Sequence, residues 1–377
     1  MGATFMPEQR TYLYVGCCTR PTPYYPSHNG KGISTFAFDE ANGTITPLGL
    51  TEGIDNPTWL GISPKHSALY ANSEVVGWNE GTASAYAIDP ATGTLSYINK
   101  QPTLGSIAAY NSRDRSGNFL LVANYSLAPE SELPNKAIAV LPIREDAGLM
   151  PASGDAVHTG TGPVPDRQER PHPHSVQATP DNRYLVVADL GLDLLVIYRF
   201  DSETGKVSRA GAASLADGAG PRHFVFHPRG EFVYVVNELN STVTSFTFEA
   251  EQAKLTTVTS VATVPESGLS GNNCSEICIS ADGAFLYVAN RGHDSIAIIG
   301  IDSEGGMELL KTVPCGGKIP RNFALSPSGN FLVVANQNSD NLTVFAVNRE
   351  TGDITPTGTV VETGTPTSVA FYQVDVG

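Results

Sequence analysis

The sequence predicts an all-β fold, a seven-bladed β-propeller of four-stranded antiparallel blades. Three observations support it: a recurring strand-like phrase, a turn before most copies, and two chain ends that complement each other. The copies read "TYLYVGC", "SALYANS", "FLLVANY", "YLVVADL", "FVYVVNE", "FLYVANR" and "FLVVANQ". The closing polar residues of the last six are spaced by 52, 65, 48, 53 and 46 residues, a period typical of propeller blades. Their β-branched and aromatic residues are typical of strands.

Turns define the strands around each phrase. The phrase follows a turn such as "SPKHS", "TPDNR", "HPRGE" or "SPSGN", in which Pro, Asp, Asn and Gly supply the backbone angles of a hairpin. One short strand precedes this turn, and two more follow the phrase, which makes four strands per repeat. A closed ring of such blades leaves no free sheet edge that could aggregate. A two-sheet sandwich is the alternative fold, whereas a WD40 array is excluded because neither Trp59 nor Trp78 is followed by Asp.

The two chain ends predict how the ring closes. The C-terminal "GTPTSVAFYQV" matches the first strand of a repeat, and the N-terminus begins at the second strand. We therefore expect the termini to share one blade within a single propeller domain, residues 1–377. The interval of 65 residues predicts a long insertion between blades at about 126–170, which carries "PVPDRQERPHPH". Long loops in compact folds are often functional.

Composition limits the partners and the compartment. A formal net charge of -15 argues against nucleic-acid and acidic-membrane partners, because phosphate binding needs Lys and Arg. The five cysteines include no C-x-x-C pair, so they are expected to be reduced thiols rather than disulfides or zinc ligands. The opening "MGATFMPEQR" lacks the apolar core of a signal peptide, and no run reaches the ~18 apolar residues of a membrane span. We expect a cytoplasmic protein, and the sequence leaves its oligomeric state open.

Charged residues recur at equivalent positions of the repeats. In "GAGPRHFVFHPRGEFVYVVNELNSTV", a hairpin turn centred on Gly230 would place Arg222 opposite Glu238. The same arithmetic in other repeats pairs His174 with Leu190, Ser275 with Arg291, and Arg321 with Gln337. Equivalent positions lie around one mouth of the central channel if the first strand of each repeat is innermost. The residues expected to converge there are His174, Arg222, Glu238, Arg291 and Arg321.

Each of these residues has a structural alternative. An Arg–Glu pair across a hairpin can be a simple ion pair contributing ~0.2 to 1 kcal/mol. Three arginines in one ring of an acidic protein instead predict a local site for a carboxylate or phosphate. His174 could be a hydrogen-bonded structural residue, but its position, equivalent to that of Arg222, favours a function. Glu276 could transfer a proton or pair with an arginine. His172 and His174 lack a third ligand, which argues against a metal site.

The sequence resembles the seven-bladed propeller lactonase family, which includes bacterial 6-phosphogluconolactonases and, more distantly, the fungal carboxymuconate-lactonizing enzyme. The resemblance covers nearly the whole chain, and "GPRHFVFHP" followed by "NELNS" is its most specific part. It implies active-site residues at His174, Arg222, Glu238 and Arg291. It implies hydrolysis of a sugar lactone to its aldonic acid, with 6-phosphoglucono-1,5-lactone as the expected substrate. No cofactor is expected, and a divalent metal in the channel is left open.

Lactone hydrolysis needs a base that activates water and a group that stabilises the oxyanion. Glu238 or His174 is the candidate base, and Arg222 is the candidate oxyanion ligand. The expected substrate-binding residues are Arg321, which would bind phosphate or carboxylate together with Arg291, and His223, Gln337 and Glu276. Two alternatives remain: a carboxymuconate cycloisomerase that uses the same His or Glu, and a non-catalytic propeller that binds sugar acids or a protein partner.

Overall fold

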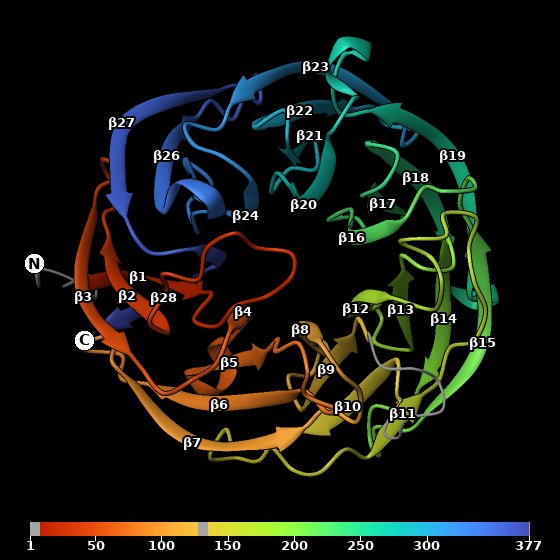
Figure 1. The fold of residues 1–377 in the computed structure, drawn as a ribbon, viewed down its shortest axis with the longest axis horizontal. Coiled ribbons are helices and arrows are strands. Elements are labelled where there is room, and N and C mark those ends of the chain that lie inside the picture. Colours follow the sequence, from red (N-terminus) through yellow and green to blue (C-terminus); the bar gives the residue numbers. More distant parts are fainter. Residues whose placement is uncertain (1–7, 127–134, 377) are drawn as a thin grey trace, which may run out of the picture.

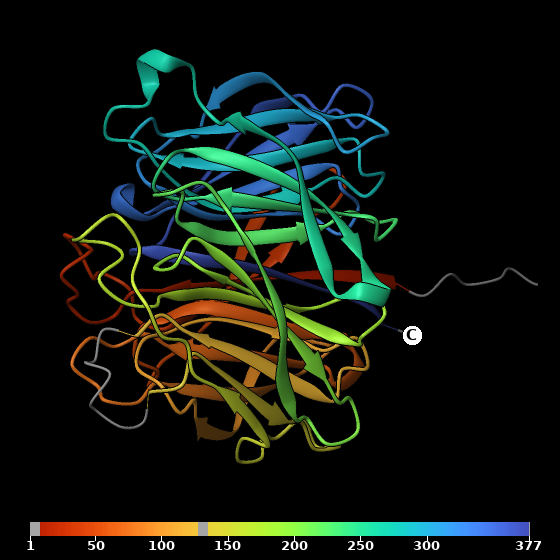
Figure 2. The ribbon, with the colours of Figure 1, turned by 90° about the vertical axis from the view of Figure 1, so that its right-hand side faces the viewer.

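The computed structural model describes residues 8–126 and 135–376, and it confirms the predicted propeller. Seven four-stranded antiparallel sheets surround a central channel, with the first strand of each blade innermost (Figure 1). Seen from the side, the blades stack around the ring as a thick disc (Figure 2). None of the helices in the described residues is long and apolar enough to cross a membrane.

Each blade has four strand positions, from the channel outward. The innermost strands are β28 (Pro366–Val376), β4 (Pro57–Ser63), β8 (Ala108–Arg113), β12 (Pro173–Ala178), β16 (Pro221–Phe226), β20 (Asn273–Ile279) and β24 (Pro320–Leu325). The second strands are β1 (Glu8–Cys17), β5 (Ala68–Ser73), β9 (Phe119–Asn124), β13 (Tyr184–Asp189), β17 (Phe232–Asn237), β21 (Phe285–Arg291) and β25 (Phe331–Asn336). These second strands correspond to the recurring phrase of the sequence.

The third strands are β2 (Ile33–Phe38), β6 (Thr82–Ile88), β10 (Ile138–Pro142), β14 (Leu194–Phe200), β18 (Thr242–Glu249), β22 (Ser295–Ile301) and β26 (Asn341–Val347). The outermost are β3 (Ile45–Thr51), β7 (Leu95–Pro102), β11 (Gly154–Ala156), β15 (Val207–Ser214), β19 (Lys254–Ala262), β23 (Met307–Pro314) and β27 (Ile354–Glu362). Short 3-10 helices lie in connections of the described chain: η1 (Pro64–His66), η2 (Ala250–Gln252), η3 (Glu266–Gly268) and η4 (Gln337–Ser339).

The ring closes through the two termini, as the sequence predicts. β28 is the innermost strand of the blade that β1, β2 and β3 complete. It pairs antiparallel with β1 from Glu8 opposite Val376 to Cys17 opposite Pro366, so the start of β1 and the end of β28 lie side by side (Figure 1). Strand pairing between the first and last segments therefore fastens the ring.

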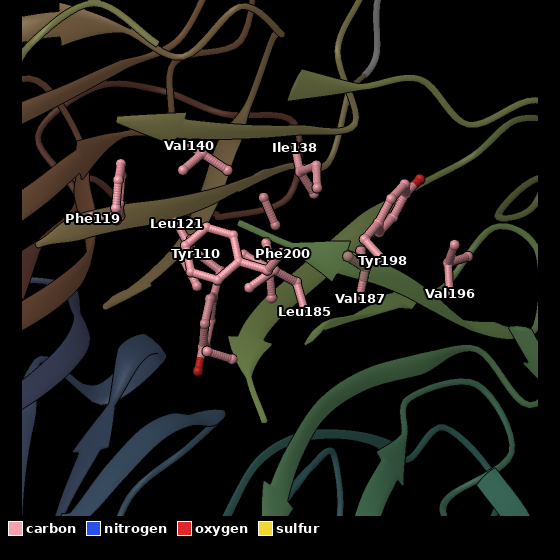
Figure 3. Packing of buried hydrophobic residues seen from close by; sticks show 13 residues of the cluster. Tyr110, Phe119, Leu121, Ile138, Val140, Leu185, Val187, Val196, Tyr198 and Phe200 are labelled. Carbon is pink, nitrogen blue, oxygen red and sulfur yellow. The ribbon is translucent and has the colours of Figure 1, made fainter. Parts of the chain in front are cut away.

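The hydrophobic core is divided among the gaps between neighbouring blades. All six residues of β5, β9, β13, β17 and β25 are buried, because each second strand has a blade packed against both faces. Figure 3 shows one such gap, whose buried cluster combines Tyr110 and Leu121 of one blade with Leu185 and Val187 of the next. Burial on both faces explains why the recurring phrase is continuously apolar rather than alternating.

The range predicted as an insertion, 126–170, includes strands. β10 and β11 form the outer half of the third blade, beside β9. Of the rest of this range, residues 127–134 lie outside the described residues, and residues 157–170 belong to the connection from β11 to β12. This connection, 157–172, brings the "PVPDRQERPHPH" segment to the channel mouth, where Arg167 lines a cavity.

The innermost strands are bulged where the sequence analysis placed its key residues. Next to Arg222, the consecutive pairs in the β16–β17 ladder are Pro221 with Asn237 and His223 with Val236. Arg222 is therefore the extra residue of a β-bulge, and the prediction that it lies directly opposite Glu238 is wrong. Equivalent bulges fall on His174 in β12 and Arg321 in β24, so their predicted pairings are wrong for the same reason.

The blade of β20 differs from this pattern. Arg291 pairs with Asn273, not with Ser275 as predicted. The ladder near the turn is already one residue out of the predicted register, with Ile277 opposite Val288, and a bulge between Cys274 and Ile277 adds a second residue. A bulge locally redirects a side chain while the strand on either side keeps its pairing. The repeated bulge thus lets buried strands turn selected polar side chains toward the channel.

Candidate active site

A cavity of about 410 Å³ lies at the channel mouth, a size typical of small-molecule sites. Six of the eight predicted site residues line it: His174, Arg222, Glu238, Arg291, Arg321 and Gln337. The other two, His223 and Glu276, are not among its lining residues; His223 contacts Arg222, and Glu276 contacts His223. Sequence reasoning missed seven polar or aromatic lining residues: Tyr24, Tyr25, Glu74, Tyr125, Arg167, Asn273 and Asn338.

Glu238 is the centre of a cluster of three guanidinium groups. Its Oε2 lies 2.9 Å from Nε of Arg222 and 3.0 Å from Nη2 of Arg291, and its Oε1 accepts a hydrogen bond of 2.5 Å from Nη2 of Arg167. Burial alone would raise the pKa of Glu238, but Arg291, Arg167 and Arg222 hold that pKa well below its ordinary value. The carboxylate is therefore ionised, and both of its oxygens are engaged by cations.

Beneath the cavity, a series of buried polar groups holds Arg222 in place. Its Nη1 donates to the Ser275 carbonyl at 2.8 Å and lies 3.2 Å from Nε2 of His223. Nδ1 of His223 lies 3.2 Å from the Glu276 carboxyl group, which also accepts a 2.5 Å hydrogen bond from Asn322. Burial, with Arg291 nearby, lowers the pKa of Arg222 to about 10, so the group stays charged at neutral pH.

His223 and Glu276 thus support Arg222 from beneath the cavity. Burial, followed by the charge of Arg222, lowers the pKa of His223 well below its ordinary value, which leaves the ring neutral. Burial raises the pKa of Glu276 to about 7, against the opposing effect of Arg222. This position of His223 suits a group that orients Arg222 better than the direct substrate binding predicted from the sequence.

His174 differs from the other buried histidines of this region. His158 bonds through both ring nitrogens, to Asp189 at 2.5 Å and to the Tyr198 hydroxyl at 2.7 Å. In His174, by contrast, Nδ1 is buried without a hydrogen-bond partner among the described residues, and the ring lines the cavity. Burial and the charge of Arg222 hold the pKa of His174 well below its ordinary value. A neutral imidazole therefore lines the site.

The opposite wall carries a second carboxylate. Glu74 Oε2 accepts a 2.6 Å hydrogen bond from the Thr58 hydroxyl and lies 3.7 Å from Nη2 of Arg321. Arg321 also lies over the ring of Tyr25, with its guanidinium carbon 4.7 Å from the ring centroid. Arg321 is thus held by aromatic and acidic neighbours. This wall therefore places one cation, Arg321, beside one carboxylate, Glu74.

Register explains why sequence reasoning missed Glu74. Pro57 pairs with Ser73 just as Pro221 pairs with Asn237, so Glu74 occupies the position of Glu238 in its own blade. The spacing is the same in both blades, but alignment of the recurring phrase on Asn72, one residue before Ser73, obscured the match. A different feature of the sequence could have indicated Arg167: it lies in the "PVPDRQERPHPH" segment of the longest interval between repeats, and long loops are often functional.

The cavity is cationic in an acidic protein. Its lining includes four arginines and two glutamates, a formal charge of +2, whereas the chain carries -15. Such a concave site attracts anions and holds them by charge-assisted hydrogen bonds. Within residues 8–126 and 135–376, no group of three or more His, Cys, Asp or Glu residues is placed to hold a metal ion.

The comparisons with known proteins agree with this architecture. The family model described as lactonase, 7-bladed beta-propeller, matches residues 12–371. A 6-phosphogluconolactonase from Bacillus subtilis is 33% identical over 93% of this chain and 97% of the relative, and one from Formosa agariphila is 32% identical over 83% and 86%. The structure of a periplasmic gluconolactonase from Pseudomonas aeruginosa superposes with a TM-score of 0.87 at 33% identity, covering 97% of this chain and 99% of that one. The chain therefore belongs to the seven-bladed β-propeller lactonase family.

Proposed function

We propose that this lactonase hydrolyses 6-phosphoglucono-1,5-lactone to 6-phosphogluconate, a step of the pentose phosphate pathway. The observation that carries the proposal is the cavity with four arginines, two glutamates and a neutral histidine, in a chain of net charge -15. An anionic sugar lactone matches both the local positive charge and the volume. The names of the Bacillus and Formosa relatives support the same substrate.

His174 is the proposed general base. Its imidazole is neutral, so it can take a proton from a water molecule as that water adds to the lactone carbonyl carbon. Glu238 is less suited to this step because three guanidinium groups occupy its oxygens. Water opens such lactones spontaneously, so a weak base in a fixed position provides enough acceleration.

Arg222 is the proposed ligand of the oxyanion. Addition of water turns the carbonyl oxygen into an oxyanion, and a guanidinium held by Glu238, Ser275 and His223 needs little reorganisation to bind it. When the tetrahedral intermediate collapses, the bond from the carbonyl carbon to the ring oxygen breaks. The ring oxygen takes the proton from the His174 imidazolium, and the product is the open acid, which ionises to the carboxylate.

The test is acid release from freshly prepared 6-phosphoglucono-1,5-lactone and from glucono-1,5-lactone, measured by titration at constant pH. We expect the protein to exceed the spontaneous rate with both and to prefer the phosphorylated lactone. A rate equal to the spontaneous rate with both lactones would refute the hydrolase, and turnover of a carboxymuconate, followed by its absorbance, would indicate a cycloisomerase instead.

We also propose a cytoplasmic location. The supporting observation is that all five cysteines, which lie within the described residues, are free thiols, and free thiols are typical of a reducing compartment. Cell fractionation with an antibody against the protein tests this location, and recovery in an extracytoplasmic fraction would contradict it.

A further inference from the structure

We propose that Arg167, on the connection between β11 and β12, is the residue that selects a phosphorylated over an unphosphorylated lactone. The inference rests on the proposed function and deepens it. Among the four arginines that line the cavity in the described chain, Arg167 alone does not come from a blade strand, since Arg222, Arg291 and Arg321 lie in β16, β21 and β24.

The first argument is depth. The exposed fraction of the Arg167 side chain is 38%, against 3% for Arg222, 15% for Arg291 and 11% for Arg321. Arg167 therefore lies at the outer rim of the cavity, whereas Arg222 lies at its floor with His174. A lactone whose carbonyl carbon reaches Arg222 directs the far end of its sugar toward the rim. That far end is where the phosphate of the proposed substrate is attached.

The second argument is the availability of donors. Arg222 and Arg291 each donate to a backbone carbonyl in addition to contacting Glu238, and Arg321 is held by Tyr25 and Glu74. A guanidinium carries five N–H groups. Arg167 needs few of these for its contacts with Glu238 and Tyr125. It can keep its ion pair with Glu238 and still donate to phosphate oxygens.

The third argument is that the segment carrying Arg167 is fixed independently of its guanidinium group. The neighbouring Gln168 is fully buried, and its side chain donates to the Leu190 carbonyl and to Asp193, each at 2.8 Å. Its side-chain oxygen accepts a hydrogen bond from the backbone of Val164. A substitution at position 167 therefore changes the chemistry of the rim without releasing the segment.

The experiment compares kcat/KM for 6-phosphoglucono-1,5-lactone with kcat/KM for glucono-1,5-lactone in the wild type, Arg167→Gln and Arg167→Lys. Charge-assisted hydrogen bonds to a phosphate stabilise a bound ligand strongly. The ratio of kcat/KM for the phosphorylated lactone to kcat/KM for the unphosphorylated one should therefore fall about tenfold or more in Arg167→Gln. Arg167→Lys should retain part of the preference, because it keeps the charge. Inorganic phosphate should inhibit the wild type competitively, with an inhibition constant about tenfold higher in Arg167→Gln.

The matched control is Arg183→Gln, which removes another exposed arginine that pairs with Asp181 and Glu251 on the outer surface and should leave the ratio unchanged. Equal losses on both lactones in Arg167→Gln, or an unchanged ratio, would overturn the inference while leaving the hydrolase intact. Failure of the wild type to hydrolyse either lactone would refute the proposed function itself, and with it the role of Arg167.

Discussion

Nε of Arg222 lies 2.9 Å from Oε2 of Glu238, although the two residues are not partners in the β16–β17 ladder. The contact depends on the bulge at Arg222, which turns its side chain toward the channel, where Glu238 follows the end of β17. The ion pair is therefore part of the cavity lining rather than a cross-strand pair on a blade surface. Its two members have different roles, which variants can separate.

His174→Gln should lower kcat/KM for the lactone by about a hundredfold or more, because general-base catalysis typically contributes that much. Its melting temperature should stay close to that of the wild type, since Nδ1 of His174 makes no hydrogen bond within the described residues that the substitution would break. Acid release and thermal denaturation measure the two effects. The matched control is His66→Gln, on η1 outside the cavity, and equal activity in both variants would exclude His174 as the base.

Glu238→Gln should lower both activity and stability. Removal of this buried carboxylate leaves Arg167, Arg222 and Arg291 without their shared counter-charge. Breaking a buried ion pair from one side typically costs about 3 kcal/mol or more. We expect a lower melting temperature in the Glu238→Gln variant than in His174→Gln. A variant that loses activity at wild-type stability would instead indicate that Glu238 acts directly as the base.

The stability of the protein should depend on pH through Glu276. Burial raises its pKa from about 4.5 to about 7, so the folded protein binds this proton more tightly than the unfolded chain. The contribution of this bound proton to the stability of the fold is fully present below about pH 4.5 and is lost as the pH rises through 7. Glu276→Gln, which cannot ionise, should therefore gain up to about 3 kcal/mol relative to the wild type between about pH 4.5 and 8. Denaturation at several pH values measures this gain, and a difference independent of pH would show that Glu276 does not titrate in this range.

Much of the fold could be predicted because the repeat is explicit in the sequence. The second strand of each blade is buried on both faces, so it requires a continuous apolar run, and the turn before it requires Pro, Asp, Asn or Gly. Seven such units and complementary ends determine the ring and its closure by β1 and β28. The five residues that the hairpin spacing predicted to converge all line the cavity, even though the predicted strand pairings were wrong.

The missed features depend on geometry that residue spacing does not encode. The turn and the bulge together shift the β20–β21 register, so spacing alone could not pair Arg291 with Asn273. Glu74 was concealed because its blade was aligned on Asn72 instead of Ser73. Arg167 lies in a connection without a repeat, so no equivalent position in another blade could indicate where its side chain points. Residue spacing also gives no depth: His223 and Glu276, predicted as substrate-binding residues apart from the hairpin pairing, do not line the cavity and lie below Arg222.

The most direct test of the account is the rate of acid release from 6-phosphoglucono-1,5-lactone by the wild type and by Arg222→Gln at neutral pH. The oxyanion role of Arg222 predicts that the wild type exceeds the spontaneous rate and that the variant loses about a hundredfold or more in kcat. Hydrolysis by Arg222→Gln at the wild-type rate would contradict the assignment of this cavity as the active site.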